Sequence, residues 1–222
     1  MWGCIMVKIS MFSGGKDGLR AAQLEWPIDV FLFLIYEFPE PSPHIVNLQS
    51  TIASASAIGV PIIVKRLHKG KEFNETVELL KKLNVDTLVA GDVYVEDHLK
   101  YMEKLVNEAG AKLKEPLWGQ DTLEILMKDI NENYLFKVLG ARPKKLRESV
   151  GKVIDKSNID WFIDLAKKDN ADPLGENGEY HTIVLSSPLH REKFKVVDIT
   201  IKELECCRIL LTSSYFNQIE YF

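Results

Sequence analysis

The stretch VKISMFSGGKDGLRAAQLEW, residues 7–26, decides the fold. Residues 6–12 predict a strand buried on both faces, and GLRAAQLEW then shows the apolar spacing of a helix that Pro27 ends. Gly14 and Gly15 stand side by side between the two elements. Adjacent glycines weaken helices and strands alike, so the turn needs a particular reason to contain them.

The same alternation of strand and helix continues along the chain. Strands are predicted at 29–38, 60–66, 86–93, 112–118 and 134–141, and helices at 45–58, 72–83, 96–109 and from Asp121 or Thr122 onward. Strands that alternate with helices of ten to fifteen residues predict an α/β fold. We expect a doubly wound, mainly parallel sheet with right-handed crossovers.

The regularity fades after about residue 146. A helix is predicted at 159–169 and a glycine-rich loop at 171–182, followed by three strands without helices between them. We therefore predict two domains, an α/β domain over 1–142 and a smaller C-terminal α+β domain over 143–222. The last strands could pair with a second subunit in a homodimer, or they could close their own sheet.

Composition narrows the class of protein. The chain has 222 residues, of which 46% are hydrophobic and 27% charged, as in an ordinary globular protein. A net charge of −4 argues against a broad nucleic-acid-binding face. The apolar run at 30–36 is too short to span a membrane, and the first residues lack the basic start of a signal peptide. Three cysteines without metal-binding spacing fit a reducing cytoplasm.

The glycine turn lies where open α/β sheets bind ligands, beyond the carboxyl ends of the strands. Outward-pointing backbone N–H groups and a helix N-terminus favour a phosphate there. Lys16 would add a cation and Ser13 a hydroxyl donor; the alternative is a plain turn with a solvated lysine. The turn is not a Walker A loop, which would need a glycine where Ser10 stands. No dinucleotide-binding G-x-G-x-x-G is present either.

Residues 13–18, SGGKDG, resemble the SGGxDS loop of the PP-loop, or N-type, ATP pyrophosphatases, a HUP-like fold. The resemblance implies that ATP and Mg²⁺ are used. In that family the serine and glycines hold the outer phosphates, which assigns ATP binding to Ser13, Gly14, Gly15, Lys16, Asp17 and Gly18. Asp17 would lie near the magnesium ion. Gly18 replaces the family's second serine, so we expect weaker ATP affinity.

Four further stretches point to one branch of these enzymes: PHIVNLQ (43–49), VAGDV (89–93), EPLWGQDT (115–122) and DPLGENGEYHT (172–182). Together they resemble the diphthine–ammonia ligase family, which completes diphthamide on elongation factor 2. The resemblance implies ATP contacts at His44 and Gly91, and substrate contacts at Asn47, Asp92, Trp118, Gly119, Asp121, Gly175, Gly178, Tyr180 and His181. Tyr101 departs from the family, because it stands near an expected arginine.

Glu176 and Glu179 are two carboxylates three residues apart among glycines. Such a pair becomes useful when it holds magnesium or orients ammonia, so we predict both as catalytic residues together with Asp17. Alternation along the strand that follows sends Tyr180 and His181 to opposite faces. Only one of those two side chains can readily line the same site.

Several of these residues also have a purely structural interpretation. His44 could be an ordinary loop histidine, and Trp118 could belong to the core or to the wall of a site. Asp121 could be a helix N-cap, because apolar periodicity begins directly after it. Gly175 and Gly178 could form a polar turn without a ligand.

The resemblance implies a two-step reaction in which the diphthine carboxylate attacks the α-phosphate of ATP and ammonia then displaces AMP. No covalent nucleophile is needed, which fits the absence of a Cys/His or Ser/His arrangement. Two alternatives stay open. One is another PP-loop adenylating enzyme, acting on a tRNA base, although nucleic acid is an unlikely partner. The other is a degenerate protein that binds ATP or AMP without catalysis.

Overall fold

The structure is a computed structural model that describes residues 6–37 and 41–216. Cys4 and part of the proline-rich linker after residue 38 lie outside the described residues. The chain forms two compact units. Of the described residues, the parallel-sheet unit contains 6–12, 17–37 and 60–119, and the antiparallel-sheet unit contains 13–16, 41–59 and 120–216.

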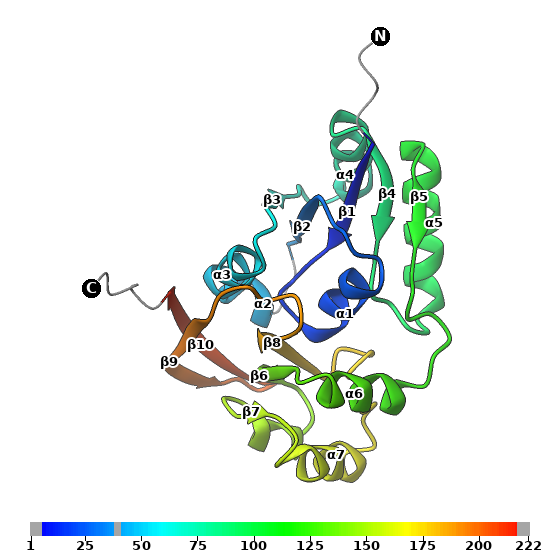
Figure 1. The fold of residues 1–222 in the computed structure, drawn as a ribbon. Coiled ribbons are helices and arrows are strands. Elements are labelled where there is room, and N and C mark those ends of the chain that lie inside the picture. Colours follow the sequence, from blue (N-terminus) through cyan, green and yellow to red (C-terminus); the bar gives the residue numbers. More distant parts are fainter. Residues whose placement is uncertain (1–5, 38–40, 217–222) are drawn as a thin grey trace, which may run out of the picture. The chain divides into compact units, whose positions relative to one another are not determined.

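The parallel-sheet unit confirms the predicted α/β fold. Its elements are β1 (Val7–Met11), α1 (Lys16–Leu24), β2 (Val30–Ile35), β3 (Ile62–Arg66), α4 (Glu72–Lys82), β4 (Val85–Val89), α5 (Glu96–Ala109) and β5 (Lys112–Lys114). Lys16, the first residue of α1, is assigned to the other unit. All five strands are parallel, in the order β3-β2-β1-β4-β5 (Figure 1). The helix predicted at 96–109 has those bounds in the structure.

One face of this sheet is buried against α4 and α5. Ile9, Leu32 and Leu88 of the three central strands are fully buried in one cluster with Leu80 of α4 and Leu105 of α5. Parallel strands need such a cover, because the helices of their crossovers lie on the sheet faces. The apolar residues whose spacing predicted α4 and α5 are therefore the residues that these helices bury against the sheet.

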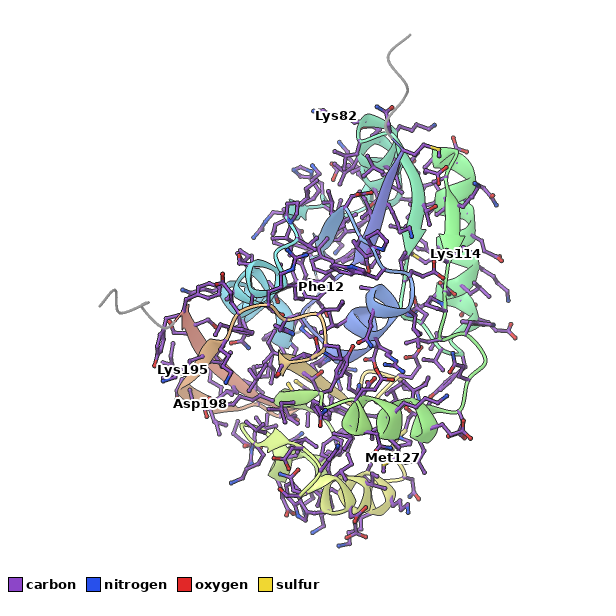
Figure 2. The ribbon with its side chains drawn as sticks, in the orientation of Figure 1. Phe12, Lys82, Lys114, Met127, Lys195 and Asp198 are labelled. Carbon is purple, nitrogen blue, oxygen red and sulfur yellow. The ribbon has the colours of Figure 1, made fainter. Side chains whose placement is uncertain are left out.

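The strand order reverses at the middle of the sheet. From β1 the chain builds β2 and β3 on one side, and then β4 and β5 on the other. The carboxyl ends of β1 and β4 are thus neighbours where the direction of winding changes. Ligands of open α/β sheets bind at this topological switch point. Phe12, labelled in Figure 2, is the first residue after β1.

The antiparallel-sheet unit contains the remaining elements. They are α2 (Pro43–Val46), α3 (Leu48–Ile58), α6 (Thr122–Asn131), β6 (Leu135–Ala141), the 3-10 helix η1 (Leu146–Ser149), β7 (Val153–Ile154), α7 (Ile159–Lys168), β8 (Tyr180–Ser186), β9 (Phe194–Glu203) and β10 (Arg208–Phe216). The sheet order is β7-β6-β10-β9, and β8 pairs with β6. Lys137 of β6 reaches Asp198 of β9, labelled in Figure 2, with Nζ and Oδ1 2.5 Å apart.

The prediction that the strand at 134–141 continues the parallel sheet is wrong. This strand, β6, pairs antiparallel with β7, β8 and β10. Because helix α6 precedes it, β6 has the local sequence pattern of a strand in a β-α-β unit. The strands that β6 pairs with, however, come later in the chain. The chain passes for the last time from one compact unit to the other between Gly119 and Gln120. The division into domains at 142/143 stays a prediction.

The C-terminal strands close their own sheet, as one of the two sequence-based alternatives expected. β10 pairs with β6 through Ile209 and Gly140, and β9 pairs with β10 along its length. The homodimer stays a prediction.

Asn47, predicted to bind substrate, is instead fully occupied inside the antiparallel-sheet unit. Its side chain is 1% exposed. The amide nitrogen donates to the carbonyls of Pro43 and Leu210, both at 2.8 Å. The amide oxygen accepts from the Thr212 N–H at 2.8 Å and from its hydroxyl at 2.9 Å. Two donated and two accepted bonds exhaust the side chain, so it fastens α2 and α3 to β10.

We expect Asn47→Ala to destabilise the protein by roughly 3 kcal/mol, because buried groups on three neighbours lose their partner. The control is Asn107→Ala on exposed helix α5 surface, which should change stability by less than about 0.5 kcal/mol. Thermal unfolding followed by circular dichroism measures both. Equal melting temperatures for the two variants would contradict this role of Asn47.

Candidate functional site

The glycine turn after β1 is held in the antiparallel-sheet unit by β8 and α3. The Ser13 carbonyl accepts from the Thr51 hydroxyl at 2.7 Å, and the Gly14 carbonyl accepts from the Val184 N–H at 2.9 Å. Gly14 has a φ of 81°, and a Cβ there would collide with the Ile183 side chain. Both the conformation and the close contact require glycine at this position.

The N–H groups of this turn are the feature that points to a ligand. Within the part of the chain that the structure describes, the N–H groups of Ser13 and Gly14 have no hydrogen-bond partner. The Gly15 N–H reaches only the Ser13 hydroxyl, at 3.4 Å. Gly14 and Gly15 are buried. Buried N–H groups are rarely left unpaired, and successive ones in a turn form an anion-binding concavity.

Lys16 is buried and fixed, so the alternative of a solvated lysine is wrong. Its side chain is 1% exposed, and its Nζ donates to the Leu174 carbonyl at 2.5 Å. The same Nζ lies 4.7 Å from the centre of the Tyr180 ring. Its backbone N–H donates to the Thr182 hydroxyl at 3.3 Å. The ammonium group therefore ties the turn to the 172–182 loop and brings a buried positive charge beside it.

His44 and His181 meet beside the turn. Their ring centres are 5.1 Å apart in an edge-to-face contact. Burial, with smaller contributions from His181 and Lys16, lowers the pKa of His44 to about 3, although a hydrogen bond with the Ser13 backbone acts in the opposite direction. Burial, with the charges of Arg142 and Lys16, lowers the pKa of His181 to about 4. Both imidazoles are thus neutral at pH 7.

The His44 ring also lies against the glycine turn. A Cβ on Gly15 would come within 3.5 Å of the ring's Cε1 atom. Among the described residues, the buried Nδ1 of His44 has no hydrogen-bond partner. A neutral imidazole can donate from one nitrogen and accept at the other. The structure thus places a spare imidazole nitrogen in the same unit as the unpaired N–H groups.

The loop before β8 is organised by its own carboxylates. Asp172 Oδ1 accepts from the N–H groups of Leu174 and Glu176 at 2.9 and 3.3 Å, and Oδ2 accepts from the Thr122 hydroxyl at 2.8 Å. Glu179 Oε1 accepts from the Asp172 N–H at 3.0 Å. Glu179 Oε2 is buried and has no partner in the described part of the chain. Of the two predicted catalytic glutamates, Glu179 is the one with an unused buried oxygen.

The two glycines of this loop have different reasons to be glycine. Gly175 has a φ of 80°, and a Cβ there would lie 2.7 Å from the Tyr180 ring. Gly178 has a φ of 75° but open space around it. Tyr180 donates its hydroxyl to the Pro173 carbonyl at 2.8 Å and is 3% exposed. Tyr180 therefore supports the loop and also lies beside Lys16, while its neighbour His181 contacts His44.

In the parallel-sheet unit, the end of β4 presses on the first turn of α1. A Cβ on Gly91 would lie 2.8 Å from the backbone C and O of Asp17 and 2.9 Å from the N of Gly18. A Cβ on Gly18 would lie 3.0 Å from the Met11 carbonyl oxygen. Glycine at position 91 lets the backbone after β4 lie directly against the backbone of the first turn of α1, at the switch point. Glycine at 18, where the PP-loop family has serine, relieves a tight contact with β1.

Three other predicted substrate residues also belong to the parallel-sheet unit. Asp92 contacts His98, with Oδ1 and Nδ1 3.1 Å apart. Trp118 is half-buried. Gly119 has a φ of 74° and donates its N–H to the Val93 carbonyl at 2.8 Å. Asp121 lies in the other unit, where it caps α6 by accepting from the Glu124 N–H at 2.9 Å, so the N-cap interpretation is confirmed.

Sequence reasoning missed four residues that shape this site: Thr51, Arg142, Leu174 and Thr182. Thr51 and Thr182 hold the turn through hydroxyl groups, and Leu174 holds Lys16 through a backbone carbonyl. Nothing local marks such contacts, since each partner is distant in the sequence. Arg142 opens a visible basic cluster, but its influence on His181 depends on the fold.

The described residues contain no ready-made metal centre. Among residues 6–37 and 41–216, no three His, Cys, Asp or Glu side chains are grouped so that they could hold a metal ion. Mg²⁺ is usually bound by one or two carboxylates together with substrate phosphates, so a single aspartate such as Asp17 fits a nucleotide-bound ion. No helix in the described ranges has the length and apolar character to cross a membrane.

Comparison with known proteins shows to which protein family this chain is similar. The description "Diphthamide synthase N-terminal domain" matches residues 6–113, and "Diphthamide synthase C-terminal domain" matches 121–212. Human and bovine proteins named diphthine–ammonia ligase are each 28% identical to this chain, over 58% and 66% of it. The chain spans about half the length of these curated relatives, 50% and 56%.

A solved structure from Methanocaldococcus jannaschii, named as a predicted subunit of tRNA methyltransferase, overlaps 83% of this chain and 98% of its own. Its identity of 16% and TM-score of 0.41 are too low to bear on function.

A parallel sheet in the order β3-β2-β1-β4-β5, with glycines at its switch point, is the arrangement of nucleotide-binding α/β proteins. Within that class the chain belongs to the diphthamide synthase family, since both domain models match it in consecutive order.

The lowered pKa values of His44 and His181 predict that the stability of the protein depends on pH. Their pKa values in the folded protein, about 3 and about 4, lie below the ordinary 6.5. As the pH falls below 6.5 the unfolded chain takes up more protons than the folded one, so the free energy of unfolding decreases toward pH 4. We expect His44→Gln with His181→Gln to flatten this decrease in melting temperature. Parallel pH profiles for wild type and double variant would contradict the assignment.

Gly91→Ala should destabilise the protein by about 2 kcal/mol, because its Cβ must displace the backbone of α1. Gly18→Ala is the matched comparison: its single tight contact is offset by about 1 kcal/mol of helix propensity. Melting temperatures test the difference. A Gly91→Ala protein as stable as Gly18→Ala would show that the two backbones do not meet closely.

Proposed function

We propose that this protein is an ATP-dependent carboxylate–ammonia ligase of the cytoplasm. Its substrates are ATP, ammonia and the diphthine side chain of elongation factor 2, and its products are diphthamide, AMP and pyrophosphate. Membership of the diphthamide synthase family and the names of the two relatives support this reaction.

The observation that carries the proposal is the pair of unpaired N–H groups at Ser13 and Gly14. Unpaired donors at the half-buried Ser13 and the buried Gly14 find partners when an anion binds to the turn. The outer phosphates of ATP are such an anion, and the buried charge of Lys16 favours them further. Gly14 takes the positive φ of 81° that gives the turn this conformation.

Asp17 follows the turn directly and opens α1 as an acidic residue in its first turn. It would hold Mg²⁺ together with phosphate oxygens. When bound, the ion neutralises charge on the polyphosphate and makes the α-phosphorus easier to attack. The diphthine carboxylate attacks that phosphorus, pyrophosphate leaves, and an acyl-adenylate forms. Ammonia then attacks the acyl carbon, and AMP leaves with the electron pair of the broken C–O bond.

The side chains around the turn have roles that suit this chemistry. His44, neutral and with a spare nitrogen, can donate a hydrogen bond to a phosphate oxygen. Glu179 offers a buried carboxylate oxygen without a partner among the described residues, which can orient an amine or ammonium. Glu176 and His181 are the remaining residues that we propose on the substrate side of the site. No residue forms a covalent intermediate.

The test is a product assay with the purified chain, ATP, Mg²⁺, ammonium and diphthine-bearing elongation factor 2. Formation of AMP and pyrophosphate that depends on this factor supports the ligase. Turnover that appears only with tRNA favours a tRNA-modifying PP-loop enzyme. Tight ATP binding without turnover in either mixture favours a non-catalytic nucleotide-binding protein.

Asp17→Asn should lower the rate of AMP formation by at least about a hundredfold, because the metal ion loses its charged ligand. Asp160→Asn is the matched control, since Asp160 is also the second residue of a helix, α7, and is exposed. Both variants should unfold at the wild-type temperature. An Asp17→Asn protein with normal kinetics would remove Asp17 from the site.

A further inference from the structure

Two adjacent cysteines, Cys206 and Cys207, lie at the end of the turn that joins β9 to β10. The turn covers residues 204–207, because Glu203 and Arg208 are the paired residues at which the two strands end and begin. The two Sγ atoms are 3.2 Å apart, and neither thiol belongs to a disulfide. The whole turn is part of the antiparallel-sheet unit. The proposed reaction gives this pair no role.

The two thiols differ in their exposure to solvent. Cys206 is half-buried, so a small reagent can reach it, whereas Cys207 is buried with 6% of its surface exposed. Redox-responsive cysteines are typically accessible and have a second cysteine beside them that completes the reaction. The exposures therefore indicate an order, in which Cys206 reacts first and Cys207 second.

A disulfide between adjacent cysteines requires the backbone to move. Consecutive Cα atoms are about 3.8 Å apart across a trans peptide bond, whereas the Cα atoms of ordinary disulfides are about 4.4–6.8 Å apart. The backbone of the turn must therefore shift as the two sulfur atoms come within bonding distance. Strained disulfides are easily reduced, which is a property of labile and regulatory bridges rather than of permanent cross-links. A labile bridge is compatible with the reducing compartment that the few cysteines predict.

Arg147 of η1 holds this turn in place. Its guanidinium donates to the carbonyls of Leu204 and Glu205, at 3.4 and 3.2 Å. The Nε of the same group donates to the Arg142 carbonyl at 3.0 Å. Within the turn, the Leu204 N–H donates to the Cys207 carbonyl at 2.8 Å. A shift of the turn backbone must therefore disturb its hydrogen bonds to Arg147.

We propose that Cys206 and Cys207 form a site of reversible oxidation, at which a small disulfide such as oxidised glutathione converts the two thiols into one disulfide. The Cys206 sulfur attacks the glutathione disulfide, one glutathione leaves, and a mixed disulfide forms. The Cys207 sulfur then attacks the Cys206 sulfur, and the second glutathione leaves. The two thiol protons and two electrons pass from the cysteines to the two glutathiones. This modification is independent of the proposed ligase reaction.

The test uses the full chain with Cys4→Ser, which leaves the pair as its remaining cysteines. Cys206→Ser, Cys207→Ser and the double variant are made in the same background. Each folded protein is mixed with oxidised and reduced glutathione at several ratios, and samples are quenched with acid over time. They are then denatured, labelled with N-ethylmaleimide and weighed by intact-protein mass spectrometry. A thiol gains one label, a mixed disulfide gains one glutathione, and an internal bridge gains neither.

With rising oxidised glutathione, we expect the protein that has both cysteines to reach a form with neither label nor glutathione. Dithiothreitol should restore both labels. Cys207→Ser should stop at a mixed disulfide on Cys206, because no second thiol can displace the glutathione. Cys206→Ser should react at least about tenfold more slowly, because its remaining thiol is buried.

The bridge should also lower the melting temperature of the protein. Loss of the hydrogen bonds from Arg147 to the turn should reduce it by about 2–4 °C in a chain of this size. The double variant is the control, since the same glutathione mixture should leave its melting temperature unchanged. An oxidised protein that melts at the temperature of the reduced one would show that the bridge does not displace the turn.

Four results would overturn the site. No change in mass at any glutathione ratio would show that the thiols do not react. A mixed disulfide that persists when both cysteines are present would show that Cys207 does not reach the Cys206 sulfur. Pairs of chains that stay joined after denaturation would show that the thiols react between molecules. Equal rates for Cys206→Ser and Cys207→Ser would show that exposure does not set the order of reaction. None of these results bears on the ligase activity.

Discussion

The site depends on a turn that keeps backbone donors buried but unpaired. An unsatisfied N–H costs about 1–3 kcal/mol when water is excluded, and the buried Gly14 holds one such group, beside the unpaired N–H of the half-buried Ser13. The surrounding contacts make this arrangement possible. Thr51 and Val184 fix the carbonyls of the turn, so the backbone cannot rotate to satisfy its donors elsewhere. An anion recovers that cost on binding, which is a physical basis for affinity before any side chain contributes.

Electrostatics around the turn act in the same direction. The Nζ of Lys16 donates to a backbone carbonyl and lies over an aromatic ring. Neither of these two groups carries a formal charge. The same buried charge helps to keep His44 and His181 neutral, because it lowers the pKa of each. The turn thus combines a fixed cation with neutral hydrogen-bonding rings, a mixture that suits a polyphosphate.

Much of the fold and part of the site could be predicted from the sequence. The strands and helices of the parallel sheet follow from apolar spacing, and the N-cap at Asp121 follows from its place before an apolar helix. The glycine turn was recognisable because the adjacent residues Gly14 and Gly15 are unfavourable both in a strand and in a helix. Asn47 could not be interpreted correctly in this way. Its partners on β10 lie more than 160 residues away, and nothing near residue 47 reveals them.

The sequence by itself determined which segments form strands and helices, and that a glycine turn follows the first strand. Those properties are local, since they depend on periodicity over a few residues and on the conformations open to glycine. Only the tertiary structure decided that β6 leaves the parallel sheet and that Lys16 is buried. It also decided that His98 meets Asp92. Strand pairing, burial and shifted pKa values arise from contacts between distant parts of the chain, which local patterns do not contain.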